Sequence, residues 1–284
     1  MATLETADGF RTVQPSAVSG DWRRTVYLAV TLAATELKVR FFDSALGYLW
    51  SLMRPLMMFG VLYLVFSEII RVGDTIEFYP VVLLMGIVLY TFVAEATGDS
   101  VESMIKHESL LRRVAFPRLV IPLAVTVTAA FNLLMNLVVV FVFMALSDVQ
   151  VRWSWLQLPV LIALLMALAL GIALLLSVLY VRFRDVKPVW QVVLQAAFYT
   201  TPILYPVELV REQYPAAVTY VMSNPLAAIN QQMRHAVLDP TAPTAAAAIG
   251  GTGRLLVPLA IVAGLFVAGL VCFVRMAPTI AEDL

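Results

Sequence analysis

Charged residues and cysteine are scarce in this sequence. Of its 284 residues only 13% are charged while 61% are hydrophobic, and the mean hydropathy is +0.89. A soluble domain is nearer a quarter charged, so the composition excludes soluble domains, disordered chains and collagen. The 19 basic residues are balanced by 19 acidic residues, and no excess positive charge favours nucleic acid. Cys272, the single cysteine, excludes an internal disulfide framework.

Motifs for catalysis and for nucleotide binding are missing too. The two histidines, His107 and His235, belong to no HExxH motif, and no nucleophile elbow is present. No GxxxxGK[ST] phosphate loop occurs, and the glycine-rich stretch 250–253 lacks a following lysine. We therefore expect no catalytic residue, metal site or cofactor in this chain. The energy for any transport would come from another subunit.

Long uncharged runs are what the sequence has instead. A bilayer core about 30 Å thick requires about 20 apolar residues in a helix, because lipid offers no partner to free backbone groups. The runs predict an all-α polytopic membrane protein with six transmembrane helices in residues 51–275, between an N-terminal region (1–50) and a tail (276–284). The expected spans are about 51–70, 78–98, 119–147, 155–181, 188–207 and 255–274.

The distribution of basic residues orients these spans. Six spans place both ends of the chain on one side, and 14 of the 19 basic residues fall on that side. Basic residues accumulate in cytoplasmic loops, so both termini are expected to be cytoplasmic. The basic residues on the opposite side are Arg71, Arg152, Arg211, Arg234 and Arg254.

Two further apolar stretches cannot span a membrane. Residues 25–35 are too few, and the periodicity of 22–42 predicts an amphipathic helix in the membrane interface. Residues 207–250 are half apolar but interrupted by charges and prolines, and they follow a helix that Pro202 and Pro206 should break. This pattern favours external re-entrant gate helices; an external cap packed for stability is the alternative.

A cytoplasmic segment between the second and third spans has amphipathic character. Residues 101–111 can form a helix with an apolar face, and Glu102, Lys106 and Glu108 lie on its other faces. Such a helix either docks a soluble partner or lies on the membrane surface as a linker. The residues alone do not separate these two interpretations.

Polar residues within the expected spans are functional candidates by default. Asn132 and Asn136 lie four residues apart and favour hydrogen bonds between helices. Glu68 and Glu95 lie near span ends, where a side chain reaches the interface. Gln191 and Gln195 are also four residues apart and could line a polar path or join helices.

The chain resembles the membrane subunit of ABC-2-type exporters of cell-surface polysaccharides, such as O-antigen, teichoic acid, capsule and galactan. The likeness covers most of residues 40–235. It rests on four segments: FFDSALGYLWSLMRPL (41–56), LLRRVAFPR (110–118), YVRFRDV (180–186) with TPILYP (201–206), and NPL (224–226) with Arg234.

The resemblance implies a homodimer in the bacterial plasma membrane, bound to two ABC ATPase subunits that hold the ATP and magnesium. It implies that the helix around residues 101–111 docks into the ATPase, through Glu102, Ile105, Lys106, Leu110, Arg112 and Arg113. It also implies a loop leading into the first span at Leu46, Gly47 and Trp50. An outer gate is expected to include Pro202, Pro206, Asn224, Pro225 and Arg234.

Aromatic residues at helical spacing are candidates for the channel lining. A lipid-linked sugar polymer slides over weak, repeated contacts, and aromatic rings offer apolar area with a polar tip. The candidates are Phe59, Tyr63 and Phe66 on the first span, and Phe198, Tyr199 and Tyr205 on or after the fifth. Packing in the core or at a dimer interface is the alternative for each.

Other functions remain open at this point. The same architecture exports drugs or lipids, whereas a membrane enzyme acting on glycans would need clustered acids or histidines, which the sequence does not contain. A purely structural membrane protein is disfavoured by the gate-like segment 207–250. The frequent use of arginine and alanine in the sequence favours a polymer of the galactan type over the other polysaccharides.

Overall fold

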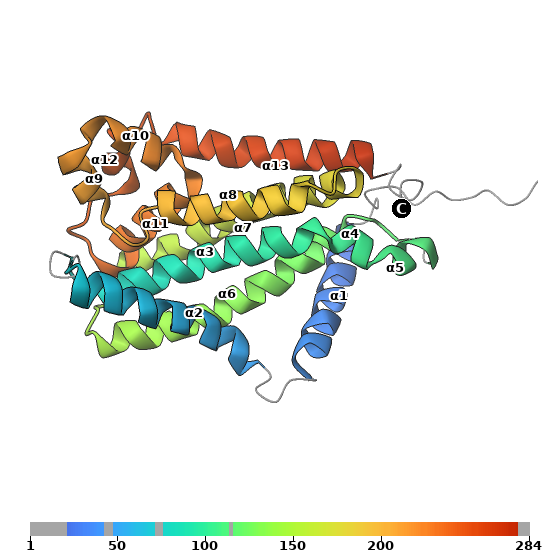
Figure 1. Ribbon diagram of the computed structural model, residues 1–284, viewed down its shortest axis with the longest axis horizontal. Helices are drawn as coiled ribbons and strands as arrows, with labels where there is room; N and C mark the ends of the chain where they lie inside the picture. The colour runs from blue at the N-terminus through green and yellow to red at the C-terminus, as the bar shows by residue number, and fades with distance from the viewer. Residues whose placement is uncertain (1–21, 43–47, 72–75, 114–115, 278–284) are drawn as a thin grey trace, which may run out of the picture.

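The computed structural model describes residues 22–42, 48–71, 76–113 and 116–277, and every element within these ranges is helical. Long helices run side by side, with short helices at both ends (Figure 1). The elements are α1 (Trp22–Phe42), α2 (Leu49–Tyr63), η1 (Leu64–Ile69), α3 (Tyr79–Val101), α4 (Ser103–Lys106), α5 (Glu108–Arg113), α6 (Val120–Leu146), η3 (Trp153–Gln157), α7 (Leu158–Arg182), α8 (Val186–Thr200), α9 (Val207–Gln213), α10 (Pro215–Ser223), α11 (Pro225–Met233), η4 (Arg234–Leu238), α12 (Ala245–Ile249) and α13 (Leu256–Met276).

Five helices in the described ranges are long and apolar enough to cross a membrane: Leu49–Ile69, Tyr79–Val101, Val120–Leu146, Trp153–Arg182 and Leu256–Met276. They match five of the six predicted spans. The remaining one, 188–207, differs, because α8 ends at Thr200 after 15 residues. Thr201 is extended, as is usual before a proline, and Pro202 has no N–H for the helical ladder.

α3 is the central helix of the bundle. Residues on all its faces are buried. In its most apolar stretch of 18 residues 72% are buried, against 6% in the corresponding stretch of the span formed by α2 and η1. A helix that is hydrophobic all round belongs in a core, and α3 packs against α6, α7 and α2. α2 is therefore a peripheral helix with most of its surface uncovered.

α7 and α13 run in the same direction and touch through glycines. A Cβ placed on Gly171 would meet the Phe266 Cα at 2.6 Å, and one placed on Gly269 would collide with the Gly171 carbonyl oxygen. The absence of side chains thus lets the two backbones approach directly, as small residues do between membrane helices.

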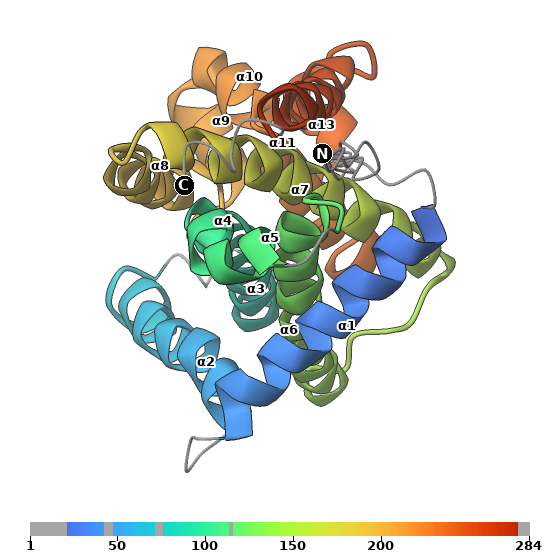
Figure 2. The same ribbon diagram turned by 90° about the vertical axis from the view of Figure 1, so that its right-hand side faces the viewer.

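α1 crosses the bundle at a steep angle, at the end where α4 and α5 lie (Figure 2). It packs on α6, and Thr25, Ala29 and Ala33 form its buried stripe. The helix expected over 22–42 is therefore present. Its buried face carries small residues, whereas Trp22 is 59% exposed.

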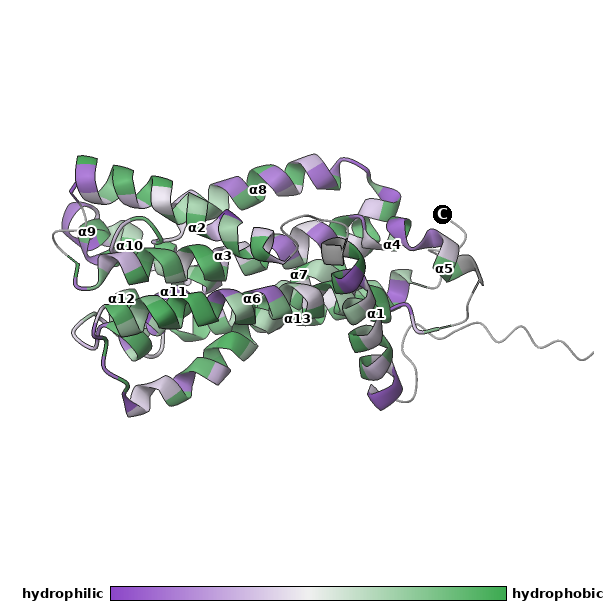
Figure 3. Cartoon of the chain, turned by 90° about the horizontal axis from the view of Figure 1, so that it is seen from below, coloured by the Kyte–Doolittle hydropathy of each residue, from purple (hydrophilic) through white to green (hydrophobic). Residues whose placement is uncertain are grey.

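The opposite end of the bundle is closed by α9, α10, α11 and α12 (Figure 1). Hydrophobic residues cover the long helices, and hydrophilic residues gather toward the two ends and along α8 (Figure 3). We call this closed end the cap end. α1, α4, α5 and the last turns of α13 lie at the other end, which we call the α1 end.

Candidate functional site

A long cavity of about 630 Å³ lies between α2 and α8, with one residue of α3 in its wall. On the α8 side Gln191 and Gln195 combine with Phe198 and Tyr199. The cavity is lined by Met57, Met58, Val61, Leu62, Tyr90, Gln191, Leu194, Gln195, Phe198 and Tyr199. The two glutamines, whose role the sequence left open, both line this cavity.

Ring contacts fix the aromatic part of this cavity. The Tyr90 and Phe198 rings meet edge to face with centroids 4.9 Å apart, and the Phe198 and Tyr199 centroids are 5.4 Å apart. The Tyr90 hydroxyl donates a hydrogen bond to the Leu194 carbonyl at 2.8 Å. Phe198 is buried by these contacts, whereas Tyr199 is 59% exposed. Tyr199 is therefore the aromatic side chain of α8 most available to a passing molecule.

The aromatic residues of the first span occupy a different place. Phe59 stacks on Tyr63 with centroids 5.6 Å apart and meets Phe143 of α6 edge to face. Phe66 also packs against the central core. None of the three lines the cavity, and the wall on α2 consists of methionine and aliphatic side chains that sequence reasoning missed. Core packing, the alternative interpretation of this stripe, is the arrangement that the structure has.

The chain reverses direction directly after α8, and polar side chains hold that turn. Nδ2 of Asn224 donates to Thr201 Oγ1 at 3.1 Å, and Nδ2 of Asn230 donates to the Pro202 carbonyl at 3.1 Å. The Tyr79 hydroxyl donates to the Leu204 carbonyl at 3.1 Å. We call residues 201–206 the outer turn.

Asn224 also begins α11. Its Oδ1 accepts a hydrogen bond from the Leu226 N–H at 3.0 Å, and Pro225 occupies the first helical position, where a missing N–H costs nothing. Gly86 of α3 makes room for the outer turn, because a Cβ there would lie 2.9 Å from Ile203 Cγ2. The predicted gate residues Pro202, Asn224 and Pro225 are thus brought together.

Arg234 ties other parts of the cap end to one another. Its NH1 lies 3.1 Å from Glu208 Oε2, and its NH2 lies 3.4 Å from Asp239 Oδ2. Arg234 is 7% exposed and Asp239 is 3% exposed. Burial opposes ionisation of Asp239, but hydrogen bonds from Thr241 and the charge of Arg234 hold its pKa below the ordinary value. Pro206 is buried beside this cluster.

At the α1 end, the predicted docking helix is broken into pieces. α3 ends at Val101, a turn at Glu102 leads into the four residues of α4, and a turn at His107 leads into α5. Ile105 packs inward against a small apolar cluster that includes Met104, whereas Lys106 is exposed. Leu110 is half-buried in α5. The inward position of Ile105 leaves it less available to a partner than the sequence pattern suggested.

Glu102 is the hub of an ion-pair network. Its carboxylate lies 2.6 Å from Lys187 Nζ and 3.4 Å from Lys106 Nζ, and it accepts a hydrogen bond from the Tyr180 hydroxyl at 3.2 Å. The hydrogen bonds from Lys187 and Lys106 hold the pKa of Glu102 below its ordinary value. Since Lys187 is in the first turn of α8, this network joins the α4 region to the helix that lines the cavity.

Some predicted site residues cannot be compared with the structure. Leu46 and Gly47 lie outside the described residues, and so do the side chains of Arg112 and Arg113. Trp50 is the second residue of α2 and is 47% exposed. Tyr205 lies in the outer turn rather than in the cavity, and its hydroxyl donates to the Tyr199 carbonyl at 3.1 Å.

Two polar contacts join the helices within the bundle. Nδ2 of Asn132 donates to Glu95 Oε2 at 3.1 Å, which confirms the expected hydrogen bond between helices, here α6 and α3. Asn136 instead donates to the Asn132 carbonyl of its own helix at 2.9 Å. Trp190 Nε1 of α8 donates to Thr97 Oγ1 of α3 at 3.0 Å. In the part of the chain that the structure describes, no three His, Cys, Asp or Glu side chains converge on a possible metal site.

Comparison with known proteins places this architecture in a family. Residues 27–238 match the ABC-2 type transporter family. The O-antigen export system permease protein RfbA of Klebsiella pneumoniae is 30% identical over 215 residues, which cover 75% of this chain and 81% of that protein. A protein of the same name from Myxococcus xanthus is 25% identical over 202 residues, covering 71% and 76%. The match includes the cavity helices α2 and α8 and the outer turn, so this chain belongs to the ABC-2 type transporter family and is a membrane permease subunit.

Proposed function

We propose that this chain is the permease of an ABC exporter that moves a lipid-linked cell-surface polysaccharide of O-antigen, teichoic acid or galactan type. Export runs from the cytoplasm across the bacterial plasma membrane, with both termini cytoplasmic. ATP hydrolysis, with magnesium, takes place in two copies of a separate ATPase subunit. The names of the related permeases support the substrate class.

The observation that carries this proposal is the cavity between α2 and α8. Its wall combines an exposed aromatic ring at Tyr199 with the amides of Gln191 and Gln195. Sugars present C–H faces to aromatic rings and hydroxyls to amides. A wall without charged residues forms weak, repeated contacts, which allow a polymer to slide.

The same face supports a homodimer. Only 6% of the most apolar 18-residue stretch of α2 and η1 is buried, and Phe198 is the one buried residue of α8. Val189 and Val192 of α8 are 60% and 66% exposed. A second copy packed on this face would cover these residues and enclose two cavities as one channel. Six spans per chain follow if α8 and the outer turn together complete the membrane crossing.

Coupling to the ATPase would pass through α4 and α5. The Glu102–Lys187 ion pair connects this region to the base of α8. An ATPase that moves α4 would therefore pull directly on the cavity wall. At the cap end, the outer turn and α9–α11 would act as the gate.

The deciding experiment has two parts. Gentle purification of the tagged chain should recover an ABC ATPase in equal amount, and depletion of the chain should cause one lipid-linked polymer to accumulate on the cytoplasmic side. Mass spectrometry of that polymer distinguishes O-antigen, teichoic acid and galactan. Normal surface polysaccharide after full depletion would refute the proposal.

Export of a drug or lipid is a second candidate. The α2 wall of the cavity is apolar, with Met57, Met58, Val61 and Leu62 in contact with the space. Flexible methionines suit varied apolar ligands. Accumulation of an amphiphile, with intact surface polysaccharide, would favour this candidate over polymer export.

A further inference from the structure

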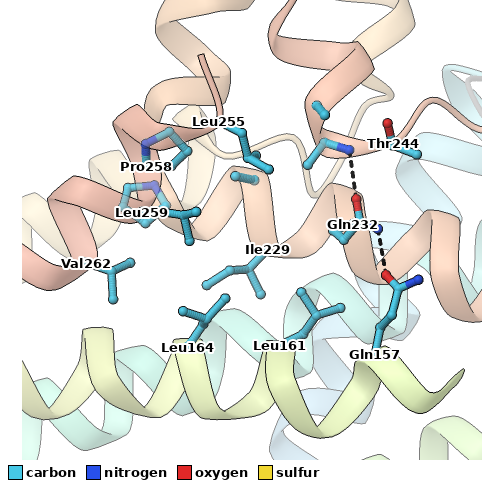
Figure 4. A pocket seen from close by; sticks show the side chains of 14 residues that line it. Gln157, Leu161, Leu164, Ile229, Gln232, Thr244, Leu255, Pro258, Leu259 and Val262 are labelled. Carbon is cyan, nitrogen blue, oxygen red and sulfur yellow. Dashed lines mark hydrogen bonds between the residues drawn. The ribbon is translucent and has the colours of Figure 1, made fainter. Parts of the chain in front are cut away.

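A second cavity, of about 360 Å³, lies on a different side of the bundle, near the cap end (Figure 4). α7 and α13 form two of its walls, and α11 and α12 form the others. Figure 4 shows Leu161 and Leu164 on α7 facing Leu259 and Val262 on α13, with Ile229 of α11 between them. We call this space the α7–α13 pocket.

The polar groups at the edge of the α7–α13 pocket are already paired. Gln232 Nε2 donates to Gln157 Oε1 at 2.8 Å, and Gln232 Oε1 accepts from the Ala245 N–H at 3.0 Å (Figure 4). The remaining lining is mainly aliphatic, and no charged side chain lines the pocket. An apolar space of this kind favours an apolar ligand over water.

The α7–α13 pocket lies near the point at which its two main walls touch. α7 and α13 touch at Gly171 and Gly269 and run in the same direction. Leu164 lies seven residues before Gly171, or about 10 Å along the helix. Toward the cap end, α11 packs against both α7 and α13. The pocket lies on the cap side of the glycine contact, and its lining on these helices includes Leu164 and Val262.

The mouth of the pocket continues into an apolar surface. Both wall helices are candidate membrane spans. Beside the pocket, Val160 of α7 is 61% exposed, and Leu256 and Val257 of α13 are 66% and 45% exposed. In a bilayer these side chains contact lipid, so the molecules that reach the mouth are bilayer lipids.

We propose that the α7–α13 pocket binds one acyl chain of a bilayer phospholipid. The chain enters from the lipid-facing surface and lies along Leu161 and Leu259, which removes the empty volume between α11 and α13. The paired amides of Gln157 and Gln232 lie at the rim, at the bundle end where the glycerol esters of a lipid would be. The proposal rests on the membrane location of the chain and not on the identity of the exported substrate.

The test counts lipids that stay bound to the full-length chain. Native mass spectrometry of the protein in mild detergent should show tightly held phospholipid in the wild type. Ala246→Phe places a ring in the pocket, because Ala246 lines it, whereas Ala247→Phe on the neighbouring exposed position does not. We expect Ala246→Phe to lose one phospholipid per chain and Ala247→Phe to lose none.

A second pair of variants lies on α13 and tests the pocket even if Ala246→Phe disturbs the folding of α12. Leu259→Trp fills the pocket from α13, and Leu256→Trp is its exposed control. Added phospholipid should raise the Tm of delipidated wild type and of Leu256→Trp, but not the Tm of Leu259→Trp. Equal lipid counts in all variants would overturn the proposal. Loss of a polyprenyl-linked saccharide instead of a phospholipid would also overturn the proposal. A change of oligomeric mass in Ala246→Phe without loss of lipid would overturn it as well.

Discussion

Nε2 of His107 lies 3.1 Å from Oε1 of Glu36, which joins the turn between α4 and α5 to α1. The other ring nitrogen, Nδ1, lies 2.9 Å from the Ser103 carbonyl and fixes the orientation of the imidazole. The helix that crosses the bundle is thereby attached to the region expected to meet the ATPase. A displacement of α4 would therefore act on α1 through this contact.

This pair predicts a pH dependence of stability. The Glu36 carboxylate holds the pKa of His107 above its ordinary value, although burial opposes the shift. The pair therefore stabilises the fold fully below the ordinary pKa of about 6.5 and loses this effect as pH rises through the raised value. We expect Glu36→Gln to cost about 0.5 kcal/mol at pH 6, since the pair is partly exposed.

Thermal unfolding at several pH values measures this effect. The Tm difference between wild type and Glu36→Gln should shrink as pH rises to 9. Lys38→Gln, at an exposed position of the same helix, controls for the loss of a charge. A Tm difference that is constant from pH 6 to 9 would contradict the assignment.

The contact between Glu102 and Lys187 predicts an uncoupled variant. Lys187→Gln leaves the α4 region and α8 without their ion pair, so ATP hydrolysis should continue while export falls by about fivefold or more, in the range of known coupling energies. Reconstituted ATPase and export assays measure the two rates separately.

Lys106→Gln is the matched control for this variant. Lys106 binds the same carboxylate at 3.4 Å, but within the segment that holds Glu102, so its removal leaves the link to α8 intact. Because Lys106 is itself a predicted docking residue, we expect Lys106→Gln to lose some export, but less than Lys187→Gln. Equal losses of export in both variants would show that the charge of Glu102, rather than the bridge, is what matters.

Substitution of Tyr199 should impair transport without impairing folding. It is 59% exposed in the cavity wall, so Tyr199→Ala should slow export and leave the Tm nearly unchanged. Tyr63→Ala should instead lower the Tm, because Tyr63 packs on Phe59. Tyr220→Ala, at an 80% exposed position outside the cavity, is the control. Unchanged export in Tyr199→Ala at normal protein level would refute the lining role.

Replacing glycine by alanine should have opposite effects on the Tm at two positions, because only one of them lies at the glycine contact. Alanine usually stabilises a helix relative to glycine by about 1 kcal/mol. At Gly171, however, the new Cβ would meet the Phe266 backbone, whereas nothing lies within 4 Å at Gly264 of α13. Gly171→Ala should therefore lower the Tm and Gly264→Ala should maintain or raise it. Thermal unfolding in detergent decides between them, and an unchanged Tm in Gly171→Ala would mean that the helices can separate freely.

Asn224 has two separable functions. Asn224→Ala should cost about 1 kcal/mol through loss of the helix cap, and it also removes the donor to Thr201. Asn224→Asp retains the cap acceptor but loses that donor, so its stability should be intermediate. Ser223→Ala is the neighbouring control. Equal unfolding free energies for the alanine and aspartate variants would show that the cap contributes little.

The long helices could be predicted because their apolar runs are uniform. Charges mark both ends of a run such as 119–147, and the observed helix, Val120–Leu146, differs by one residue at each end. The end of α8 was harder to place. The outer turn is as apolar as the helix before it, and its course depends on Asn224, Asn230 and Tyr79, which lie far away in sequence.

Breaks in the helical pattern could be predicted locally. Pro202 was expected to break the helix before it, and α8 ends at Thr200. Periodicity alone could not decide which face of α2 looks inward, since Phe59 and Met57 are equally apolar and differ only in their neighbours. Lys187, which pairs with Glu102, and Glu36, which pairs with His107, come from other helices, so no local pattern indicated these two contacts.

The outer turn also continues the chain at the level where α8 stops. α8 is about 22 Å long at 1.5 Å per residue, shorter than a bilayer core of about 30 Å, and the chain reverses beside Gly86. The carbonyls of Pro202 and Leu204 accept hydrogen bonds from Asn230 of α11 and Tyr79 of α3. A passage opened at this level would have to break both hydrogen bonds or carry their donors along with the turn.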